Sequence, residues 1–145
     1  MFITFAVAAA LTAAEKPAIA KQYGDFHHSI AIDIADSSSG TLILEYATLN
    51  DGEWEMEPSP GSTINPGDQV EYVNGSPGPG PVGGRIVLMA ASGGQLTISF
   101  SWDGEGQPDC NASLDGSSTL SVDTQTINDE SSNSTCEVTV SSSDT

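Results

Sequence analysis

The sequence predicts an all-β protein, an antiparallel β-sandwich of about eight strands closed by one disulfide. Three observations support this prediction: short runs in which apolar and polar residues alternate, turn signals between these runs, and a single pair of cysteines. Alternation with a period of two turns one side of a strand toward a core and the other toward water. Several such runs separated by glycine, proline and asparagine are typical of a sandwich.

Eight segments carry the alternation or are rich in β-branched and aromatic residues. They are Ser29–Ile34, Thr41–Leu49, Glu53–Glu57, Asp68–Val73, Arg85–Ala91, Gln95–Trp102, Thr119–Ile127 and Cys136–Val140. In Glu53–Glu57 the same rule places Trp54 and Met56 on one face and the glutamates on the other. After residue 25, no stretch has a helical apolar period of useful length. We therefore expect the core to lie between two stacked sheets.

Three polar segments between the strands are predicted to be loops. Pro58–Gly67 contains prolines, which cannot donate to a strand ladder. Asn74–Gly84 consists largely of glycine and proline, and Asp103–Gly116 is mostly polar. Loops on a rigid scaffold are the usual place for binding residues. The end of the sandwich that carries Trp54 and the last two segments is therefore the expected binding surface.

The N-terminus resembles a signal peptide. Phe2–Ala14 is one apolar run, too short to span a bilayer comfortably, and Ala18-Ile19-Ala20 fits a cleavage site. No lysine or arginine precedes the run, so a buried N-terminal helix is the alternative. We expect residues 1–20 to be a leader, residues 21–145 to form a single β-sandwich domain, and the protein to be secreted.

The cysteines and two glycosylation motifs agree with export. Cys110 and Cys136 form an even pair, which an oxidising compartment would join in a disulfide. Asn111 and Asn133 each begin an acceptor motif close to one of the cysteines. A third motif at Asn74 is made poor by the proline that follows it. The sequence therefore predicts a disulfide-bonded glycoprotein.

The charge of the chain excludes some partners. Twenty acidic residues against three basic ones give a net charge of -17. Such a field repels nucleic-acid phosphates and anionic membrane surfaces. We expect no nucleic-acid binding and interpret the acidity as a source of solubility. Cation binding by clustered carboxylates is the alternative interpretation.

No arrangement of catalytic residues stands out, so we expect no enzyme. No serine has a G-x-S-x-G setting, and His27 and His28 are neighbours just before a strand, where their side chains are expected to point to opposite faces. The strongest metal candidates are Asp103, Glu105 and Asp109, because carboxylate oxygens in a glycine-rich segment suit calcium. Their spacing does not match an EF-hand loop, and no other cofactor is expected.

The two tryptophans are the largest apolar side chains. Trp102 shares a strand face with Phe100 and Leu96, which favours a core position. Trp54 stands among glutamates and close to two loops. It belongs either to the core or to an exposed surface for sugar stacking or insertion at a membrane interface.

The segment from Thr41 to Asp103 resembles the aegerolysin family and its cytolysin neighbours, including actinoporin-like proteins. The resembling elements are an early strand, Gly52-Glu53-Trp54, Ile64-Asn65-Pro66-Gly67-Asp68, the glycine-rich Gly78–Gly84, and a strand that ends in Trp102-Asp103. The resemblance implies a β-sandwich that recognises membrane lipids such as sphingolipids, sometimes as the targeting half of a two-component pore. It assigns ligand binding to Trp54, Trp102 and Asp103. Gly104–Pro108 lacks the aromatic residues that the family has there, a departure that affects the lipid site more than the fold.

The sequence therefore predicts a secreted, non-enzymatic protein that recognises a membrane-lipid (sphingolipid-type) or glycan head group through loops. Cytolysin-like activity is an extension of this hypothesis. The alternative is a structural or adhesive surface protein, either a carbohydrate-binding or a filament-forming module, with or without calcium. Self-association or a partner protein is compatible with both.

Overall fold

The computed structural model describes residues 27–116, 119–130 and 133–143, which form ten strands in two sheets. The strands are β1 (His28–Ser37), β2 (Leu42–Asp51), β3 (Glu53–Met56), β4 (Thr63–Ile64), β5 (Gln69–Ser76), β6 (Val82–Ala90), β7 (Gln95–Trp102), β8 (Asp109–Asp115), β9 (Leu120–Glu130) and β10 (Asn133–Ser142). Sheet I has the strand order β3-β5-β1-β10-β9, and sheet II has the order β4-β2-β6-β7-β8. The prediction of an all-β sandwich with one disulfide is confirmed.

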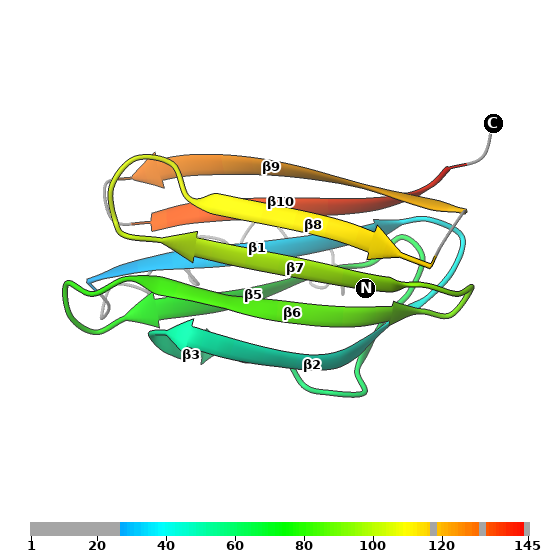
Figure 1. The fold of residues 1–145 in the computed structure, drawn as a ribbon, viewed down its shortest axis with the longest axis horizontal. Helices are drawn as coiled ribbons and strands as arrows, with labels where there is room; N and C mark the ends of the chain where they lie inside the picture. The colour runs from blue at the N-terminus through cyan, green and yellow to red at the C-terminus, as the bar shows by residue number, and fades with distance from the viewer. Residues whose placement is uncertain (1–26, 117–118, 131–132, 144–145) are drawn as a thin grey trace, which may run out of the picture.

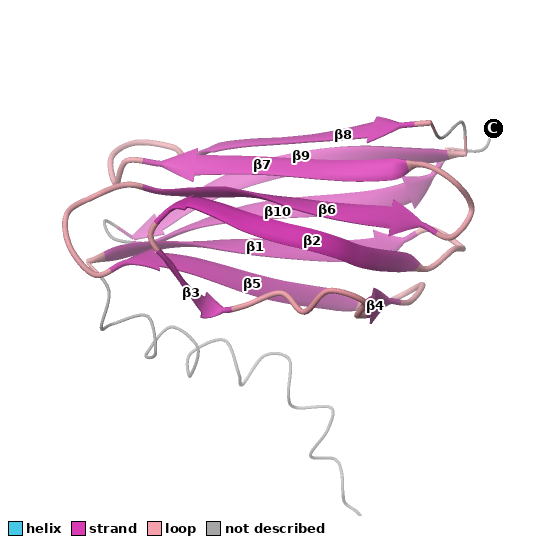
Figure 2. Cartoon of the chain, turned by 60° about the horizontal axis from the view of Figure 1, so that its bottom comes forward, coloured by secondary structure: helices cyan, strands magenta, loops and turns pink. Residues whose placement is uncertain are grey.

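The two sheets lie against each other as layers, and their strands run along the long axis of the molecule (Figure 1). Most connecting loops therefore gather at two opposite ends, whereas the connection from β3 to β4 runs along one side of the sandwich (Figure 2). Neighbouring strands are antiparallel except for β1 and β10, which run parallel from Ser29–Asn133 to Ser37–Ser141. This parallel pair brings the first and last strands together in the middle of sheet I.

Alternating aliphatic side chains fill the space between the sheets. One buried cluster contains Ile30, Ile32 and Ile34 of β1, Ile86 and Leu88 of β6, and Leu96, Ile98, Phe100 and Trp102 of β7. Removing one such side chain from water contributes about 1.5–3 kcal/mol. The strands that the sequence pattern defines most clearly are thus the ones that hold the layers together.

Two strands lie inside segments that the sequence predicted to be loops. The two-residue β4 falls between the prolines of Pro58–Gly67 and pairs with the start of β2. β8 occupies the middle of Asp103–Gly116 and pairs with β7 along its whole length. The loop prediction is wrong for β8 because its half-buried residues Cys110, Ala112 and Leu114 are mostly small. Their alternation with polar residues gives only a weak hydrophobic signal.

A β-bulge separates two side chains of β3. The register opposite β5 shifts between Trp54 and Met56. Trp54 packs against the main core, whereas Met56 packs against Ala31 and Val73 in a separate small cluster. The prediction that Trp54 and Met56 share a face is wrong, because the extra residue of a bulge interrupts the alternation.

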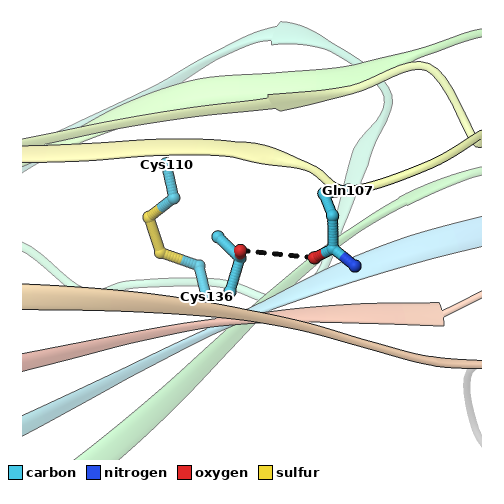
Figure 3. Close-up of a disulfide and its surroundings, with 4 residues drawn as sticks. Gln107, Cys110 and Cys136 are labelled. Carbon is cyan, nitrogen blue, oxygen red and sulfur yellow. Dashed lines mark hydrogen bonds between the residues drawn. A yellow bond between two sulfur atoms is a disulfide. The ribbon is translucent and has the colours of Figure 1, made fainter.

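Cys110 and Cys136 form the predicted disulfide, which joins the two sheets (Figure 3). Cys110 lies on β8 of sheet II and Cys136 on β10 of sheet I, with their Cα atoms 6.2 Å apart. Close to the disulfide, Thr126 Oγ1 of β9 donates a hydrogen bond to Gln107 Oε1 at 3.3 Å. β8 is an edge strand with few large apolar residues, so the covalent bond fastens the least hydrophobic part of sheet II to the opposite layer.

The predicted leader, residues 1–20, lies outside the described residues. The described residues contain no helix with the length and apolar character needed to cross a membrane. The leader, the domain limits of 21–145 and secretion stay predictions.

Replacing both cysteines (Cys110→Ala with Cys136→Ala) is expected to lower the free energy of unfolding by about 3 kcal/mol. The disulfide closes a loop over a sequence separation of 26 residues, and such a cross-link restricts the unfolded chain. Urea unfolding followed by tryptophan fluorescence measures the loss, and reduction of the native protein serves as a control. An unchanged urea midpoint in both experiments would contradict the role given to this bond.

Candidate functional site

Three connections meet at one end of the sandwich, which we call the loop end. They are the turn at Gly52 between β2 and β3, the loop of residues 77–81 between β5 and β6, and the loop of residues 103–108 between β7 and β8. β1 begins at this same end (Figure 1). The structure therefore brings together the two loops that the sequence analysis assigned to the binding surface.

The side chain of Asn74 on β5 connects its strand to three others, β2, β3 and β6, at the loop end. Asn74 is fully buried on β5. Its Nδ2 donates to the carbonyls of Asp51 at 3.2 Å and Glu53 at 3.0 Å, and its Oδ1 accepts from the Gly83 amide at 2.7 Å. A Cβ at Gly52, which has a φ of +81°, would lie 2.6 Å from Asn74 Nδ2. Only glycine fits this turn, because it tolerates positive φ and leaves room for the amide.

A buried imidazole lies under the two loops. His28 is the first residue of β1, is 4% exposed, and packs edge-on against Trp102 with ring centroids 5.4 Å apart. A Cβ on Gly104 would lie 3.3 Å from His28 Cε1, so the loop of residues 103–108 covers the ring closely. The Nδ1 atoms of His27 and His28 are 3.3 Å apart. The expectation that these two side chains point to opposite faces is wrong, because His27 precedes the strand.

Burial lowers the pKa of His28 below 6.5, and the adjacent His27 lowers it further. A backbone hydrogen bond with Gly80 and the charge of Asp103 act in the opposite direction and do not cancel the effect of burial. His28 Nε2 is buried and has no hydrogen-bond partner among the described residues. The imidazole is therefore neutral at pH 7 and acts as part of the packing beneath the loops.

The loop end carries a hollow of about 380 Å³, which we call the end hollow. Four carboxylates line it, and the other lining residues are polar or apolar: Asp51, Asp103, Glu105 and Asp109, with Pro81, Val82, Ser101, Trp102 and Gln107. Asp103 Oδ1 accepts a hydrogen bond from the Glu105 amide at 3.0 Å, an Asx-type turn that shapes the start of the loop. No lysine or arginine is among the lining residues, so the end hollow has a negative potential.

The three predicted ligand-binding residues take different positions. Asp103 is exposed and lines the end hollow. Trp102 also lines it but is only 3% exposed, and its Nε1 donates to the Gly106 carbonyl at 3.1 Å. Trp54 is half-buried, packs against Phe100 with ring centroids 6.4 Å apart, and does not line the end hollow. The tryptophans thus contribute mainly to packing.

The predicted calcium ligands Asp103, Glu105 and Asp109 all line the end hollow. No group of three or more histidine, cysteine, aspartate or glutamate side chains in the described part of the chain is arranged to hold a metal ion. The geometry therefore gives the calcium hypothesis no support.

The acceptor asparagines differ in exposure. Asn111 is exposed on β8, whereas Asn133 is half-buried and its Oδ1 accepts a hydrogen bond from Ser29 Oγ at 2.7 Å. Asn74 of the third motif is buried and fully engaged, so the folded protein cannot carry a glycan there. Glycosylation at Asn111 and Asn133 stays a prediction.

Sequence reasoning missed the roles of Asn74, His28 and Asp51. Asn74 was placed at the start of a loop, although it directly follows the β-forming run of Asp68–Val73 and precedes a glycine. An asparagine at such a strand end is a recognisable candidate for bonding to backbone groups. Nothing in the local sequence indicates that His28 packs on Trp102, because that contact joins residues far apart in the chain.

Comparison with known proteins identifies the fold. No protein-family model and no curated protein sequence matches the chain. The lipid-binding protein Nakanori matches with a TM-score of 0.72 at 11% identity, over 88% of this chain and 78% of that protein. RahU, solved in complex with a TRIS molecule, matches with a TM-score of 0.60 at 18% identity, over 80% and 94%. The lectin XCL of Xerocomus chrysenteron matches with a TM-score of 0.51 at 12% identity, over 78% and 98%.

At these identities the likeness concerns the fold alone. The fold is aegerolysin-like, as the resemblance of Thr41–Asp103 implied. Its structural neighbours include a lipid-binding protein and a lectin.

Asn74→Ala is expected to lower the free energy of unfolding by about 3 kcal/mol, because it removes the hydrogen bonds to the carbonyls of Asp51 and Glu53 and leaves the buried Gly83 amide without its partner. Urea unfolding measures the loss. The matched control is Asn65→Ala at an exposed position, which should change stability by less than about 0.5 kcal/mol. Equal effects of the two substitutions would show that Asn74 is not a structural clamp.

Acidification is expected to destabilise the protein through His28. The unfolded chain binds a proton near pH 6.5 and the folded chain only at lower pH. Stability from neutral His28 is therefore complete above pH 6.5 and is lost as the pH falls through the folded pKa. An NMR titration of the His28 Hε1 signal should have its midpoint below 6.5. In His28→Gln the stability should fall less between pH 7.5 and pH 5 than in the native protein. A midpoint at or above 6.5 would refute this.

Proposed function

We propose that this chain is a secreted, non-enzymatic binding protein whose loop end recognises the head group of a membrane lipid of the sphingolipid type. The observation that carries the proposal is the end hollow, whose walls come from loops and strand ends held on a rigid double layer. A volume of about 380 Å³ is within the range of small-ligand sites. The likeness in fold to a lipid-binding protein supports the choice of ligand class.

The charge of the end hollow selects among lipid head groups. Asp51, Asp103, Glu105 and Asp109 surround it, and these carboxylates attract an ammonium group and repel an anionic head group. Phosphocholine, the head group of sphingomyelin, carries such an ammonium. The net charge of -17 acts in the same direction over the whole molecule. A neutral or zwitterionic membrane is therefore the expected surface.

A glycan head group is the second candidate, supported by the likeness in fold to a lectin. Carboxylates accept hydrogen bonds from sugar hydroxyls, so the same hollow suits the sugar of a glycolipid. Cytolysin-like pore formation is an extension of the lipid proposal, and dye release from vesicles tests it separately.

The direct test is sedimentation with vesicles of four compositions: sphingomyelin with cholesterol, phosphatidylcholine, phosphatidylserine, and lactosylceramide in phosphatidylcholine. We expect binding to sphingomyelin vesicles and none to phosphatidylserine vesicles. Binding only to lactosylceramide vesicles would select the glycan candidate. Absence of binding to all four compositions would overturn the proposal.

A pair of variants locates the binding surface. Asp51→Asn with Asp103→Asn removes two charges from the end hollow and is expected to weaken vesicle binding roughly threefold to tenfold. The control is Asp115→Asn, which removes an exposed charge at the far end of β8. Equal binding by all three proteins would place the lipid surface elsewhere.

A further inference from the structure

A second hollow lies on the outer face of sheet II and is not part of the loop-end proposal. Its volume is about 560 Å³, and its lining is almost entirely polar: Thr48, Asn50, Arg85, Ser99, Ser101, Asp109 and Asn111, with Gly84 and Phe100. We call it the Arg85 groove. It adjoins the end hollow, because Ser101 and Asp109 line both.

The strand register explains the shape of this groove. Thr48 pairs with Arg85, Arg85 with Ser99, and Ser99 with Asn111, so four exposed side chains from four neighbouring strands stand in one row. In the next row toward the loop end, Gly83 pairs with Ser101. Glycine has no side chain and serine a short one, which leaves the surface open beside the guanidinium. The groove thus results from small residues next to one long cationic side chain.

Arg85 is the only lysine or arginine between residues 27 and 143. An arginine guanidinium presents planar donors that match a carboxylate or sulfate in a bidentate arrangement. The hydroxyls and amides around it can both donate and accept hydrogen bonds. Asp109, on the other side of the groove, accepts only. A bound molecule would therefore carry its negative group toward Arg85 and hydroxyl donors toward Asp109.

An exposed aromatic residue stands next to the row. Tyr46 is 42% exposed, precedes Thr48 by two positions on the outward face of β2, and lies just outside the residues that line the groove. A tyrosine ring offers an apolar surface with a polar edge, which suits the flat face of a sugar. A cation, hydroxyl and amide groups, a carboxylate and an aromatic ring thus occupy neighbouring positions on one sheet face.

We infer that the Arg85 groove binds a saccharide unit that carries one carboxylate or sulfate group. The anionic group pairs with Arg85, the hydroxyls with Asp109, Asn111 and Ser99, and the ring lies beside Tyr46. The saccharide should carry only one negative group, because the net charge of -17 on the protein repels a polyanion before it reaches the groove. This inference is independent of the proposed function, since the loop end and the groove are different surfaces that share only two residues.

The test uses the full chain made in a bacterial periplasm that adds no N-glycans, because Asn111 lines the groove and is itself a predicted glycosylation site. The probes are methyl glucuronide and glucose 6-sulfate as acidic sugars, methyl glucoside as the neutral counterpart, and inorganic sulfate as the free anion. Isothermal titration calorimetry or ligand-observed NMR measures binding. We expect the acidic sugars to bind more strongly than both the neutral sugar and the free anion.

Two variants decide the assignment. Arg85→Gln is expected to weaken binding of the acidic sugars about tenfold or more, and Arg85→Lys should lose part of it, because lysine keeps the charge without the planar fork. Asp115→Asn, which removes an exposed charge outside both hollows, should leave sugar binding unchanged. The inference is overturned by failure of both acidic sugars to bind, by equal binding in Arg85→Gln, or by equal affinity for the neutral sugar. Vesicle binding by Arg85→Gln reports separately on the loop end. Failure of the groove inference can therefore be distinguished from failure of the lipid proposal.

Discussion

Contact between the inward aliphatic faces of the two sheets is the interaction on which the rest of the molecule depends. β1 lies in the middle of sheet I, and its isoleucines share one buried cluster with the inward residues of β6 and β7. Once these faces are stacked, the strand directions place the connections at two ends of the sandwich. The disulfide then secures the β8 edge, and Asn74 secures the turn and strands at the loop end. The end hollow exists because these constraints act together.

Much of the fold could be predicted from period-two alternation, because burial of one strand face leaves a direct mark on the sequence. Gln95–Trp102 is the clearest case, with Leu96, Ile98, Phe100 and Trp102 all in the core. The parallel pairing of β1 with β10 could not be predicted in this way, because it joins the first and last strands of the chain and alternation says nothing about which strands pair. β8 escaped prediction because small half-buried residues resemble a polar loop. The bulge in β3 was not predicted, because one inserted residue turns Trp54 and Met56 toward different sides of the sheet without changing their spacing in the sequence.

The sequence predicted the location of the candidate site more successfully than the individual residues that line it. The loops were recognisable from glycine, proline and polar composition, but which side chains line the end hollow depends on strand register. Asp103 was predicted because it directly follows the most regular strand. Asp51 was not predicted, because it belongs to β2 and reaches the end hollow only through the pairing of β2 and β7 on either side of β6. Trp54 and Trp102 are large and apolar, and such side chains are drawn into the core. The distribution of charge then separates two surfaces, an acidic loop end and a sheet face with one arginine.

The central claim is that the loop end, positioned by the stacked sheets, is the surface that meets the lipid. Amide shifts of labelled protein titrated with sphingomyelin nanodiscs test this most directly. The account predicts that the signals that change belong to Asp51–Trp54, residues 78–82 and Asp103–Asp109, with His28 beneath them. Changes confined to the opposite end, at residues 91–94 and Asp115, would contradict it.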